Sequence, residues 1–430
     1  MKSTFRKFVP IFVLNWYHLI LALLGAIFYC FPSKKTKVIG ITGTNGKSTV
    51  VELTAKILEE TGFKIASLSS IKFKIREKEW QNDLKMTMPG RFRIQKFLRQ
   101  AVASGCQYAV LEVTSEGIKQ HRHRFIDFEA AVFTNLSPEH IESHGGFEKY
   151  RSAKGELFKA AKNIHIINLD DENAEYFLQF PAEKKYLYQI KNQKIPAYRQ
   201  AGKIKIIDQN SKISKDINNI GLNLKLPGEF NIYNSLAAIC VGLSQGINLE
   251  IGKRAVEKIE GIPGRMEEVM SEPFKVIVDY AFTPNALEKA YQTIQDTKYK
   301  IQNTKMICVL GACGGGRDKW KRPVLGEIAA KYCDKIIITN EDPYDEDPRQ
   351  ILSMIKSGIS KSKFPIPNFY EILDRREAIR KSLTLAKPGD TVIITGKGCE
   401  PWICVANGKK IPWDDREIVR EETREINLDI

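Results

Sequence analysis

The amino-acid sequence predicts an α/β protein, with two domains built on mostly parallel sheets and a short apolar helix in front of them. Short apolar runs rich in β-branched residues alternate with amphipathic stretches along most of the chain. This alternation is typical of βαβ units, whose parallel strands are covered by helices on both faces. The 430 residues suffice for two or three domains, and a hydrophobic content of 43% allows each domain a full core.

Residues 1–36 contain an apolar stretch without charged residues, Phe8–Phe31, which has basic residues on both sides. Its length matches the roughly 20 residues that cross a bilayer. Pro10, Asn15 and His18 speak against a span, and the bases on both sides leave its orientation open. No small-residue cleavage site follows, so a removed signal peptide is not expected. Two interpretations stay open: a membrane-associated helix, or a helix packed on the next domain.

The region 37–262 is expected to form the central domain. It begins with the strand Val38–Thr42 and a helix from Lys47 through Leu58. From Lys184 to Leu226, short alternating runs separated by polar turns predict an antiparallel flap. The other elements predicted here are the strands Tyr108–Thr114, Ala130–Asn135 and Ile164–Asn168 and the helix Asn231–Gln245.

Residues 263–430 are expected to form a second, Rossmann-like α/β domain. The run Gly261-Ile262-Pro263-Gly264 is typical of a linker. The strands predicted after it are Lys275–Val278, Met306–Leu310, Lys335–Thr339 and Asp390–Thr395. Ligands gather in clefts between domains, so we expect the functional site in such a cleft.

Charge and cysteine usage narrow the class of partner and the compartment. The net charge of +15 suits polyanionic substrates, nucleic acid or an anionic membrane face. Basic residues are interleaved with acids and form no aromatic-studded stripe, which argues against nucleic acid. The eight cysteines show no C-x-x-C and lie in apolar runs, which favours reduced structural thiols over zinc. We expect a cytoplasmic protein, at the inner face of the membrane if Phe8–Phe31 enters lipid.

A glycine-rich turn lies where the first strand of the central domain gives way to a helix. Backbone N–H groups at such a helix start bind anions. Lys47 is placed to reach terminal phosphates, and the Ser48 hydroxyl to ligate Mg²⁺. The spacing departs from the standard G-x-x-x-x-G-K-[ST] loop, because Ile41 stands where its first glycine would be. The loop residues assigned to ATP are Gly43, Thr44, Asn45, Gly46, Lys47, Ser48 and Thr49.

Polar residues follow two further predicted strands. Glu112 lies at the end of one, within the run Leu111–Gly117, and the run Phe133–His140 follows another. A carboxylate at the carboxyl end of a strand, beside a phosphate loop, is well placed to hold Mg²⁺. The sequence therefore predicts a nucleotide and metal site at this sheet edge.

The order of these motifs resembles the Mur ligases, from about Lys37 to the carboxyl end. The loop form G-T-N-G-K-[ST] is shared by Mur ligases and folylpolyglutamate synthases. The blocks in both predicted domains are most similar to the members that add the third residue to UDP-N-acetylmuramoyl-dipeptide. The resemblance implies the cofactors ATP, Mg²⁺ and a carbamate formed from CO₂.

The resemblance also implies a metal and catalytic set. Glu112 and His140 occupy the positions of metal ligands, and Lys154 that of a lysine which CO₂ converts to a carbamate. An unmodified lysine is a cation without an acceptor atom and cannot coordinate Mg²⁺, whereas its carbamate offers an anionic oxygen. The implied catalytic residues are Lys47, Glu112, His140 and Lys154, and the implied metal ligands are Ser48, Glu112, His140 and Lys154.

Further binding residues follow from the same resemblance. Arg265 would offer planar, bidentate phosphate binding as the γ-phosphoryl moves. Arg317 would meet the carboxylate of the incoming amino acid, and Glu400 its side chain or amine. The other implied ATP contacts are Asn135, Asn234 and Asp279. The implied substrate contacts are Thr87, Ser115, Arg122, Arg317, Asp342, Gly396 and Glu400.

The chain departs from the family pattern in ways that affect specificity. Where diaminopimelate-adding members have D-N-P-R, this chain has Glu341-Asp342-Pro343-Tyr344, without the arginine that holds the distal carboxylate. Glu116, Phe282 and Cys399 stand at positions that are usually histidine. These changes favour lysine or another diamine over diaminopimelate and leave the amino acid open.

The segment before the loop is a second departure. Family members carry a uridine-binding domain there, which residues 1–36 cannot form. Either the nucleotide end of the substrate is held differently, or the substrate is not UDP-linked.

The predicted reaction is ATP-dependent peptide-bond formation through an acyl phosphate, in peptidoglycan precursor synthesis. The expected partners are a UDP-linked or lipid-linked muramoyl peptide and a free amino acid. One alternative keeps this chemistry with a lipid-linked or folylpolyglutamate-type acceptor. An alternative of another class is a membrane-anchored P-loop switch or transport ATPase, which would need no amino-acid site.

Overall fold

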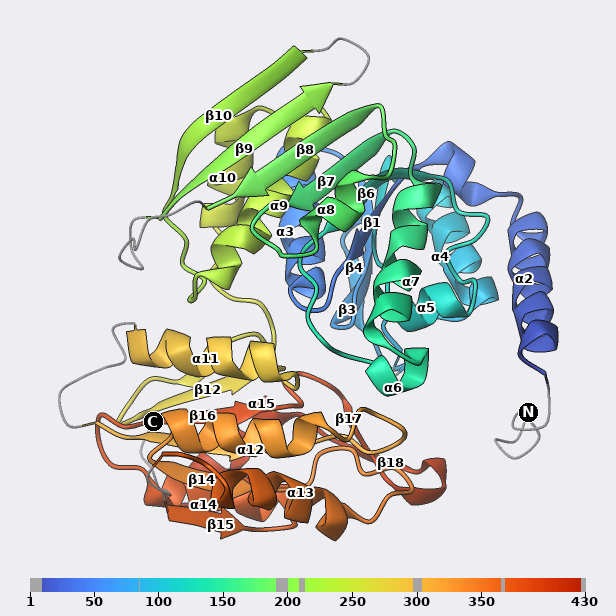
Figure 1. The fold of residues 1–430 in the computed structure, drawn as a ribbon. Coiled ribbons are helices and arrows are strands. Elements are labelled where there is room, and N and C mark those ends of the chain that lie inside the picture. The colour runs from blue at the N-terminus through green and yellow to red at the C-terminus, as the bar shows by residue number, and fades with distance from the viewer. Residues whose placement is uncertain are drawn as a thin grey trace. The chain divides into compact units, whose positions relative to one another are not determined.

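The computed structural model describes residues 10–84, 86–190, 200–208, 213–296, 304–364 and 368–426. The chain divides into two compact units, each an α/β layer structure (Figure 1). Unit 1 comprises Met1–Leu136, Glu148–Leu224 and Asn231–Lys258, and unit 2 comprises Ser137–Phe147, Lys225–Phe230 and Ile259–Ile430. Phe8 and parts of the predicted flap, residues 191–199 and 209–212, lie outside the described residues. The fold class predicted from the sequence is confirmed, whereas the boundary at 262/263 stays a prediction.

Unit 1 contains a ten-stranded sheet in the order β10-β9-β8-β7-β6-β1-β5-β2-β3-β4. Its centre, from β8 to β2, is parallel, and antiparallel strands extend both edges. The strands are β1 (Lys37–Thr42), β2 (Ile65–Leu68), β3 (Lys72–Ile75), β4 (Lys78–Gln81), β5 (Tyr108–Glu112), β6 (Phe128–Phe133), β7 (Ile164–Asn168), β8 (Lys184–Gln189), β9 (Gln200–Asp208) and β10 (Ile213–Leu222).

The antiparallel pairing predicted from Lys184 is confirmed for the described residues, because β8 pairs antiparallel with β9, and β9 with β10. β8 also pairs parallel to β7, which joins these strands to the central sheet and was not predicted. Within β8, Lys185 is buried through its stem and donates to the Leu178 carbonyl.

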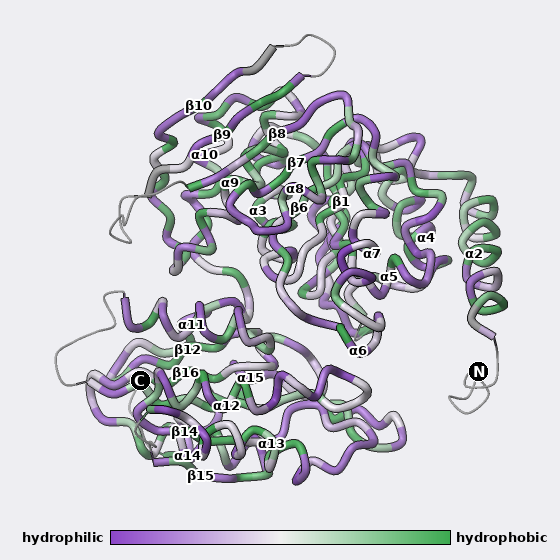
Figure 2. Tube along the Cα trace, viewed as in Figure 1, coloured by the Kyte–Doolittle hydropathy of each residue, from purple (hydrophilic) through white to green (hydrophobic). Residues whose placement is uncertain are grey.

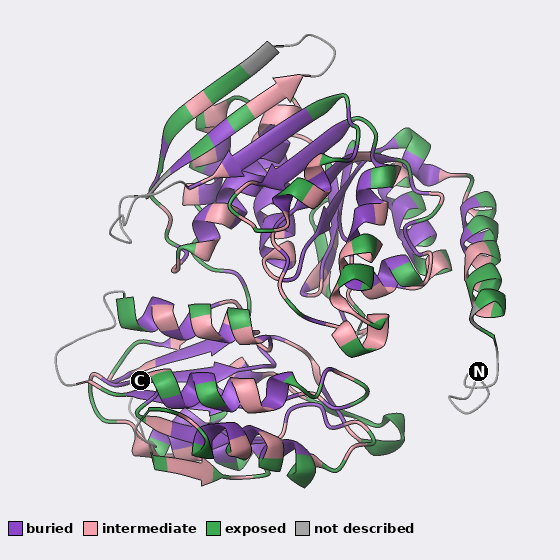
Figure 3. Ribbon diagram, in the orientation of Figure 1, coloured by how far each residue is buried: buried purple, intermediate pink, exposed green. Residues whose placement is uncertain are grey.

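The central strands of unit 1 are buried on both faces, as Figures 2 and 3 show for the hydrophobic interior. α7 packs closely on β1 at Gly40, where a Cβ would lie 2.8 Å from the side chain of Leu157. Helices of this part of the chain are α3 (Lys47–Glu60), α4 (Arg91–Ala103), α5 (Ser115–Lys119), α7 (Phe147–Ala160), α8 (Ala174–Leu178), α9 (Phe230–Ser244) and α10 (Leu249–Glu257).

The apolar amino-terminal segment forms α2 (Ile11–Phe28), followed by the 3₁₀ turn η1 (Pro32–Lys35). α2 lies along α4 in unit 1 (Figure 1), and a Cβ on Gly25 would lie 3.5 Å from the backbone of Arg91. This packing agrees with the second of the two interpretations. Within the described residues, none of the helices combines the length and apolar character that a membrane span requires.

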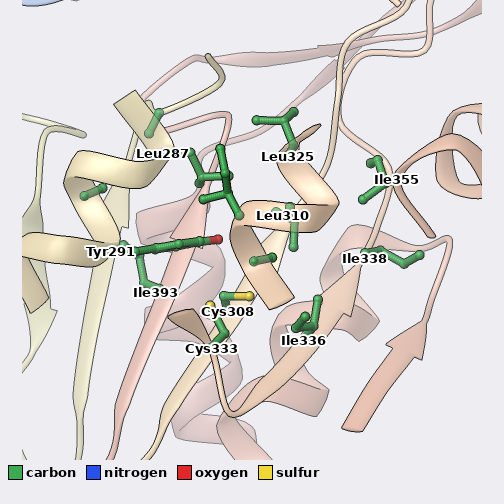
Figure 4. Close-up of a cluster of buried hydrophobic side chains, with 14 of the residues drawn as sticks. Leu287, Tyr291, Cys308, Leu310, Leu325, Cys333, Ile336, Ile338, Ile355 and Ile393 are labelled. Atoms are coloured by element: carbon green, nitrogen blue, oxygen red, sulfur yellow. The ribbon is translucent and has the colours of Figure 1, made fainter. Parts of the chain in front are cut away.

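Unit 2 contains a six-stranded sheet in the order β11-β12-β16-β13-β14-β15, parallel except for the edge strand β11. Alternate residues of its strands face two cores. Cys308 and Leu310 pack with Leu287 and Tyr291 in one core (Figure 4), and Ile307 packs in the other. The strands are β11 (Glu267–Met270), β12 (Lys275–Asp279), β13 (Met306–Leu310), β14 (Lys335–Ile338), β15 (Asn368–Glu371) and β16 (Thr391–Thr395), with the separate hairpin β17 (Trp402–Cys404) and β18 (Lys410–Pro412).

Helices cover both faces of this second sheet. The core shown in Figure 4 is closed by α11 (Pro284–Asp296), α12 (Lys321–Tyr332) and α13 (Pro348–Ser360). The opposite core is closed by α14 (Arg375–Leu385) and α15 (Asp415–Glu425). The short helix α6 (Ile141–His144) and the 3₁₀ turn η2 (Ala406–Gly408) complete the unit.

Candidate active site

The predicted phosphate loop connects β1 to α3 in unit 1. Gly43 has φ +151° and Gly46, the residue before the helix, has φ +83°. Only glycine fits either position, since a Cβ would lie 1.9 Å from Thr134 Oγ1 at Gly43 and 2.3 Å from Asn234 Oδ1 at Gly46. The first turn of α3 therefore presents its N–H groups and positive dipole end beside this loop, as anion binding requires.

Side chains after β6 hold the loop in shape. The Asn45 N–H donates to Asn135 Oδ1 at 2.9 Å, and Asn135 Nδ2 donates to the Asn45 carbonyl at 3.0 Å. Thr134 Oγ1 donates to the same carbonyl at 2.7 Å. Asn135 thus lies at the loop, as predicted, and its contacts are with the loop backbone.

A hydroxyl and a carboxylate meet next to the loop. Ser48 Oγ donates to Glu112 Oε2 at 2.7 Å, and Glu112 is buried at the end of β5. The Lys47 ammonium donates to the Thr44 carbonyl at 2.8 Å and lies 3.8 Å from Glu112 Oε1. Hydroxyl and carboxylate oxygens are the ligands that Mg²⁺ prefers, so this pair fits a magnesium ion bound with nucleotide phosphates.

Sequence reasoning missed Ser70, which belongs to the same group. Its Oγ lies 2.7 Å from Ser48 Oγ, and its N–H donates to Glu112 Oε2 at 2.9 Å. Ser70 follows β2, the neighbour of β5 in the sheet. The strand-end rule that identified Glu112 would have identified Ser70, had the short strand β2 been predicted.

Lys154 reaches the loop from α7. It is 2% exposed, its ammonium donates to the Gly43 carbonyl at 2.7 Å, and it lies 4.6 Å from the centre of the Tyr150 ring. Tyr150 in turn lies 3.1 Å from Thr44 Oγ1 through its hydroxyl. Lys154 is therefore a buried lysine beside the phosphate loop of unit 1, and its conversion to a carbamate stays a prediction.

His140, by contrast, groups with unit 2. Its imidazole lies 3.4 Å from the Arg317 guanidinium, and its backbone adopts φ +57°. Asp318 accepts hydrogen bonds from the Ile141 and Glu142 N–H groups, and so caps the start of α6. Glu112 and Lys154 belong to unit 1, and metal binding by His140 together with these two residues stays a prediction.

A buried ion pair fixes the segment Ser137–Phe147 within unit 2. Lys321 Nζ donates to Glu139 Oε1 at 2.8 Å, and the two side chains are 2% and 3% exposed. The Lys319 N–H donates to Glu142 Oε1 at 2.8 Å as a further link. Sequence patterns gave no sign of this pair, because its members stand far apart in the chain.

The predicted amino-acid site in unit 2 is a buried network of charges. Lys397 is completely buried and donates to Asp342 Oδ2 at 2.9 Å and to Glu400 Oε2 at 2.7 Å. Tyr280 donates to Glu400 Oε1 at 2.9 Å. The structure therefore brings Asp342 and Glu400 together, through a lysine to which the sequence assigned no role.

A third carboxylate, Glu341, lies next to this network. Cys313 Sγ donates to Glu341 Oε1 at 2.8 Å, while the buried Glu341 Oε2 has no hydrogen-bond partner. Burial and the neighbouring Asp342 raise the pKa of the Glu341 carboxyl. Gly396, predicted to contact substrate, has φ +106°, and a Cβ there would lie 2.5 Å from Glu341 Oε2.

The two ATP contacts predicted in unit 2 lie side by side. The Arg265 guanidinium lies 4.4 Å from the centre of the Tyr280 ring. Asp279 accepts from the Met266 N–H at 2.6 Å and from the Ala281 N–H at 2.8 Å. Burial raises the pKa of Asp279, and the positive charge of Arg265 opposes this rise. The visible role of Asp279 is to hold the backbone from which Arg265 projects, and nucleotide contact stays a prediction for both.

Three predicted substrate residues lie together in unit 1. Arg122 donates to the Met88 carbonyl and to Gln120 Oε1, and thereby holds the segment that contains Thr87. Burial lowers the pKa of Arg122 to about 10. Ser115 begins α5 and is buried next to the helix cap Thr114. Their contact with substrate stays a prediction.

Comparison with known proteins identifies the family of this chain. The Mur ligase middle domain matches residues 41–242, and the Mur ligase, glutamate ligase domain matches residues 264–398. A UDP-N-acetylmuramoyl-L-alanyl-D-glutamate--2,6-diaminopimelate ligase from Syntrophomonas wolfei is 40% identical over 94% of this chain and 81% of its own length. A UDP-N-acetylmuramyl-tripeptide synthetase from Roseiflexus sp. is 33% identical over 94% of this chain and 82% of its own length.

Solved structures show the same fold. A UDP-N-acetylmuramoyl-L-alanyl-D-glutamate--2,6-diaminopimelate ligase matches 91% of this chain and 79% of its own with a TM-score of 0.56 and 29% identity. Folylpolyglutamate synthase from Mycobacterium tuberculosis, complexed with ADP and AMPPCP, matches 88% of this chain and 92% of its own with a TM-score of 0.67 and 16% identity. Together with the phosphate loop and the Ser48–Glu112 pair, these matches establish that the chain belongs to the Mur ligase family of ATP-dependent amide-bond-forming ligases.

Proposed function

We propose that this ligase adds lysine or a similar diamino acid to a muramoyl dipeptide, through an acyl phosphate. As a member of this family, the chain is an ATP-dependent ligase that adds an amino acid to a muramoyl peptide in peptidoglycan precursor synthesis. The observation that supports the choice of amino acid is the charge network around Lys397. This network contains more carboxylates than lysines, so it is suited to bind a further cation.

The balance of charge favours a second ammonium group on the amino acid. Three carboxylates, Glu341, Asp342 and Glu400, gather at the ends of β14 and β16. Lys397 is already engaged by Asp342 and Glu400, so it is poorly placed to bind a distal carboxylate as well. A side-chain ammonium would be attracted to this network, whereas a further buried carboxylate would be repelled.

Tyr344 supports the same choice. It stands where diaminopimelate-adding members have an arginine, and its ring lies against Gly315, where a Cβ would meet it at 2.5 Å. Arg317, 3.4 Å from His140, is the cation that we assign to the α-carboxylate. Lysine has one carboxylate and requires one such cation. Diaminopimelate has two carboxylates and would require a second cation.

In unit 1 we assign the phosphoryl-transfer machinery. Lys47 and the N–H groups at the start of α3 bind the ATP phosphates, so that an acceptor carboxylate can attack the γ-phosphorus and release ADP. Ser48 and Glu112 would hold Mg²⁺, which neutralises charge on the phosphates. The amine of the amino acid then attacks the acyl carbon, and phosphate leaves. Lys154 is the proposed carbamate, and His140 is the proposed second metal ligand.

The experiment compares amino acids directly. The protein is incubated with ATP, Mg²⁺, bicarbonate and UDP-linked muramoyl dipeptide, and lysine, ornithine or diaminopimelate is added before product masses are measured. We expect the largest yield with lysine, and Tyr344→Arg should raise the yield with diaminopimelate. A wild-type preference for diaminopimelate would show that the charge argument is wrong, even though ligase activity itself is retained.

A lipid-linked acceptor is the second candidate, and the apolar surface of α2 is the observation that favours it. The same assay with a lipid-linked muramoyl peptide in detergent distinguishes the two. A folylpolyglutamate-type acceptor would be detected as a mass increase on folate. We no longer consider a switch or transport ATPase, because the chain belongs to the Mur ligase family.

A further inference from the structure

One face of α2 packs on α4, and the opposite face is apolar and exposed. Ala22 and Ala26 are buried on the inner face. We define the outer face as the exposed large side chains of the helix, of which Trp16 is 63% and Phe28 71% exposed. They are Phe12, Val13, Trp16, Tyr17, Ile20, Leu23, Leu24, Ile27 and Phe28. Figure 2 shows α2 as mostly hydrophobic, and Figure 3 shows exposed stretches of it between buried and intermediate ones.

This outer face extends onto the neighbouring helix. The exposed ring of Phe92 in α4 lies 6.5 Å from the ring of Phe28. Most of the large exposed hydrophobic side chains among the described residues belong to α2, so the rest of the described surface is ordinary by comparison. A contiguous apolar surface of this kind marks a site of interaction.

The surroundings of the outer face are basic and contain few acids. From Met1 to Val51 the sequence has no aspartate or glutamate, and α4 has none either. Lys34 and Lys35 are exposed directly after α2. α4 adds the exposed side chains of Arg93, Lys96 and Arg99. Positive charge therefore borders the apolar face without local compensation from either segment.

We propose that the outer face of α2 docks on an anionic lipid bilayer, with the helix axis parallel to the surface. An apolar face bordered by lysine and arginine binds at the boundary between headgroups and acyl chains, and tryptophan is favoured at that depth. The bases of α4 and of the turn after α2 would contact lipid phosphates. Because the inner face stays packed on α4, docking needs no rearrangement of the helix. This proposal does not depend on which acceptor the enzyme uses.

A second copy of the chain fits this face less well. In a two-fold symmetric dimer the same patch lies on both sides of the interface. The basic borders of the two copies would then face one another, and like charges repel. An anionic bilayer instead supplies the opposite charge together with an apolar interior.

The experiment measures binding of the full chain to vesicles of phosphatidylglycerol and phosphatidylcholine, compared with vesicles of phosphatidylcholine alone. We expect binding to the anionic vesicles, weakened by salt. The double variant Ile20→Asp/Leu24→Asp should weaken this binding at least tenfold. The matched control, Leu373→Asp/Ile411→Asp, changes exposed hydrophobic residues of unit 2 and should bind like wild type. Thermal unfolding and ligase activity without lipid check that each variant is folded.

A second measurement does not depend on these variants. Brominated lipids should quench part of the wild-type tryptophan fluorescence, and Trp16→Phe should remove that part. Absence of vesicle binding, absence of Trp16 quenching, or equal binding by Ile20→Asp/Leu24→Asp would overturn the proposal. So would light scattering that shows a dimer which this double variant dissociates, because a second copy would then cover the face.

Discussion

Replacement of Lys321 by methionine tests whether a buried ion pair holds the segment of His140 on unit 2. Lys321 and Glu139 meet at 2.8 Å and are almost fully buried, and Glu139 Oε2 has no hydrogen-bond partner. Lys321→Met leaves the Glu139 carboxylate buried without the cation that it contacts directly, which costs about 3–5 kcal/mol. The segment can escape this cost by leaving unit 2, because Glu139 then becomes hydrated.

The assay is hydrogen exchange at the Ile141 and Glu142 N–H groups, which donate to Asp318 while the segment is docked. A loss of 3 kcal/mol corresponds to exchange that is faster by roughly 100-fold. The double variant Glu139→Gln/Lys321→Met removes the uncompensated charge and should recover most of the protection.

Lys319→Met is the matched control for this test. Lys319 is 55% exposed and lies 3.7 Å from Glu346, and such a surface pair contributes about 0–1 kcal/mol. Exchange at Ile141 and Glu142 should therefore change several-fold at most. Exchange in Lys321→Met that matches wild type would refute the reasoning, as would equal effects of Lys319→Met and Lys321→Met.

Three further predictions concern the loop, the lysine and the buried carboxyl. Gly46→Ala should weaken ATP binding, measured by calorimetry, because φ +83° and the 2.3 Å approach to Asn234 both disfavour a Cβ; unchanged affinity in Gly46→Ala would contradict this. Lys154→Ala should abolish ligation, and ¹³C-bicarbonate should give a carbamate NMR signal in wild type that this variant lacks; full activity of the variant would exclude the metal role. Burial raises the pKa of Glu341, so this group favours the folded state below its ordinary pKa of about 4.5 and loses that contribution as the pH rises through its folded pKa. Glu341→Gln should therefore gain stability relative to wild type at neutral pH and not at pH 4, as urea unfolding would show, and a difference independent of pH would count against this assignment.

Local sequence determined the phosphate loop. An apolar run, glycines at positions of positive φ and a following helix are neighbours in the chain, so their geometry depends little on distant residues. The strand-end rule also placed Glu112 correctly. β5 pairs parallel to β1 with Glu112 opposite Ile41, which sets its carboxylate beside the residues that follow β1.

The same reasoning could not predict contacts between residues that are far apart in the chain. The antiparallel pairing predicted from Lys184 is confirmed for β8, β9 and β10, whereas the parallel pairing of β8 with β7 was not predicted, because strand direction depends on a distant partner. The sequence assigned no role to Ser70 or Lys397. Ser70 contacts Ser48 and Lys397 contacts Asp342, which are both predicted site residues. A buried ion pair and the Asp318 cap hold the segment of His140 in unit 2, which the sequence did not indicate, and its role as a metal ligand with Glu112 stays a prediction.

By itself, the sequence determined the α/β class, the family and the glycine-rich loop between β1 and α3, and it predicted the groups that would carry the chemistry. Each of these depends on hydrophobic periodicity, on glycine or on motifs that are contiguous in the chain. Only the tertiary structure decided which charges are paired: Lys397 with Asp342 and Glu400, Lys321 with Glu139, and Lys154 with the Gly43 carbonyl. A charge removed from water must find its partner through space, and no local pattern records which distant residue packing brings to it.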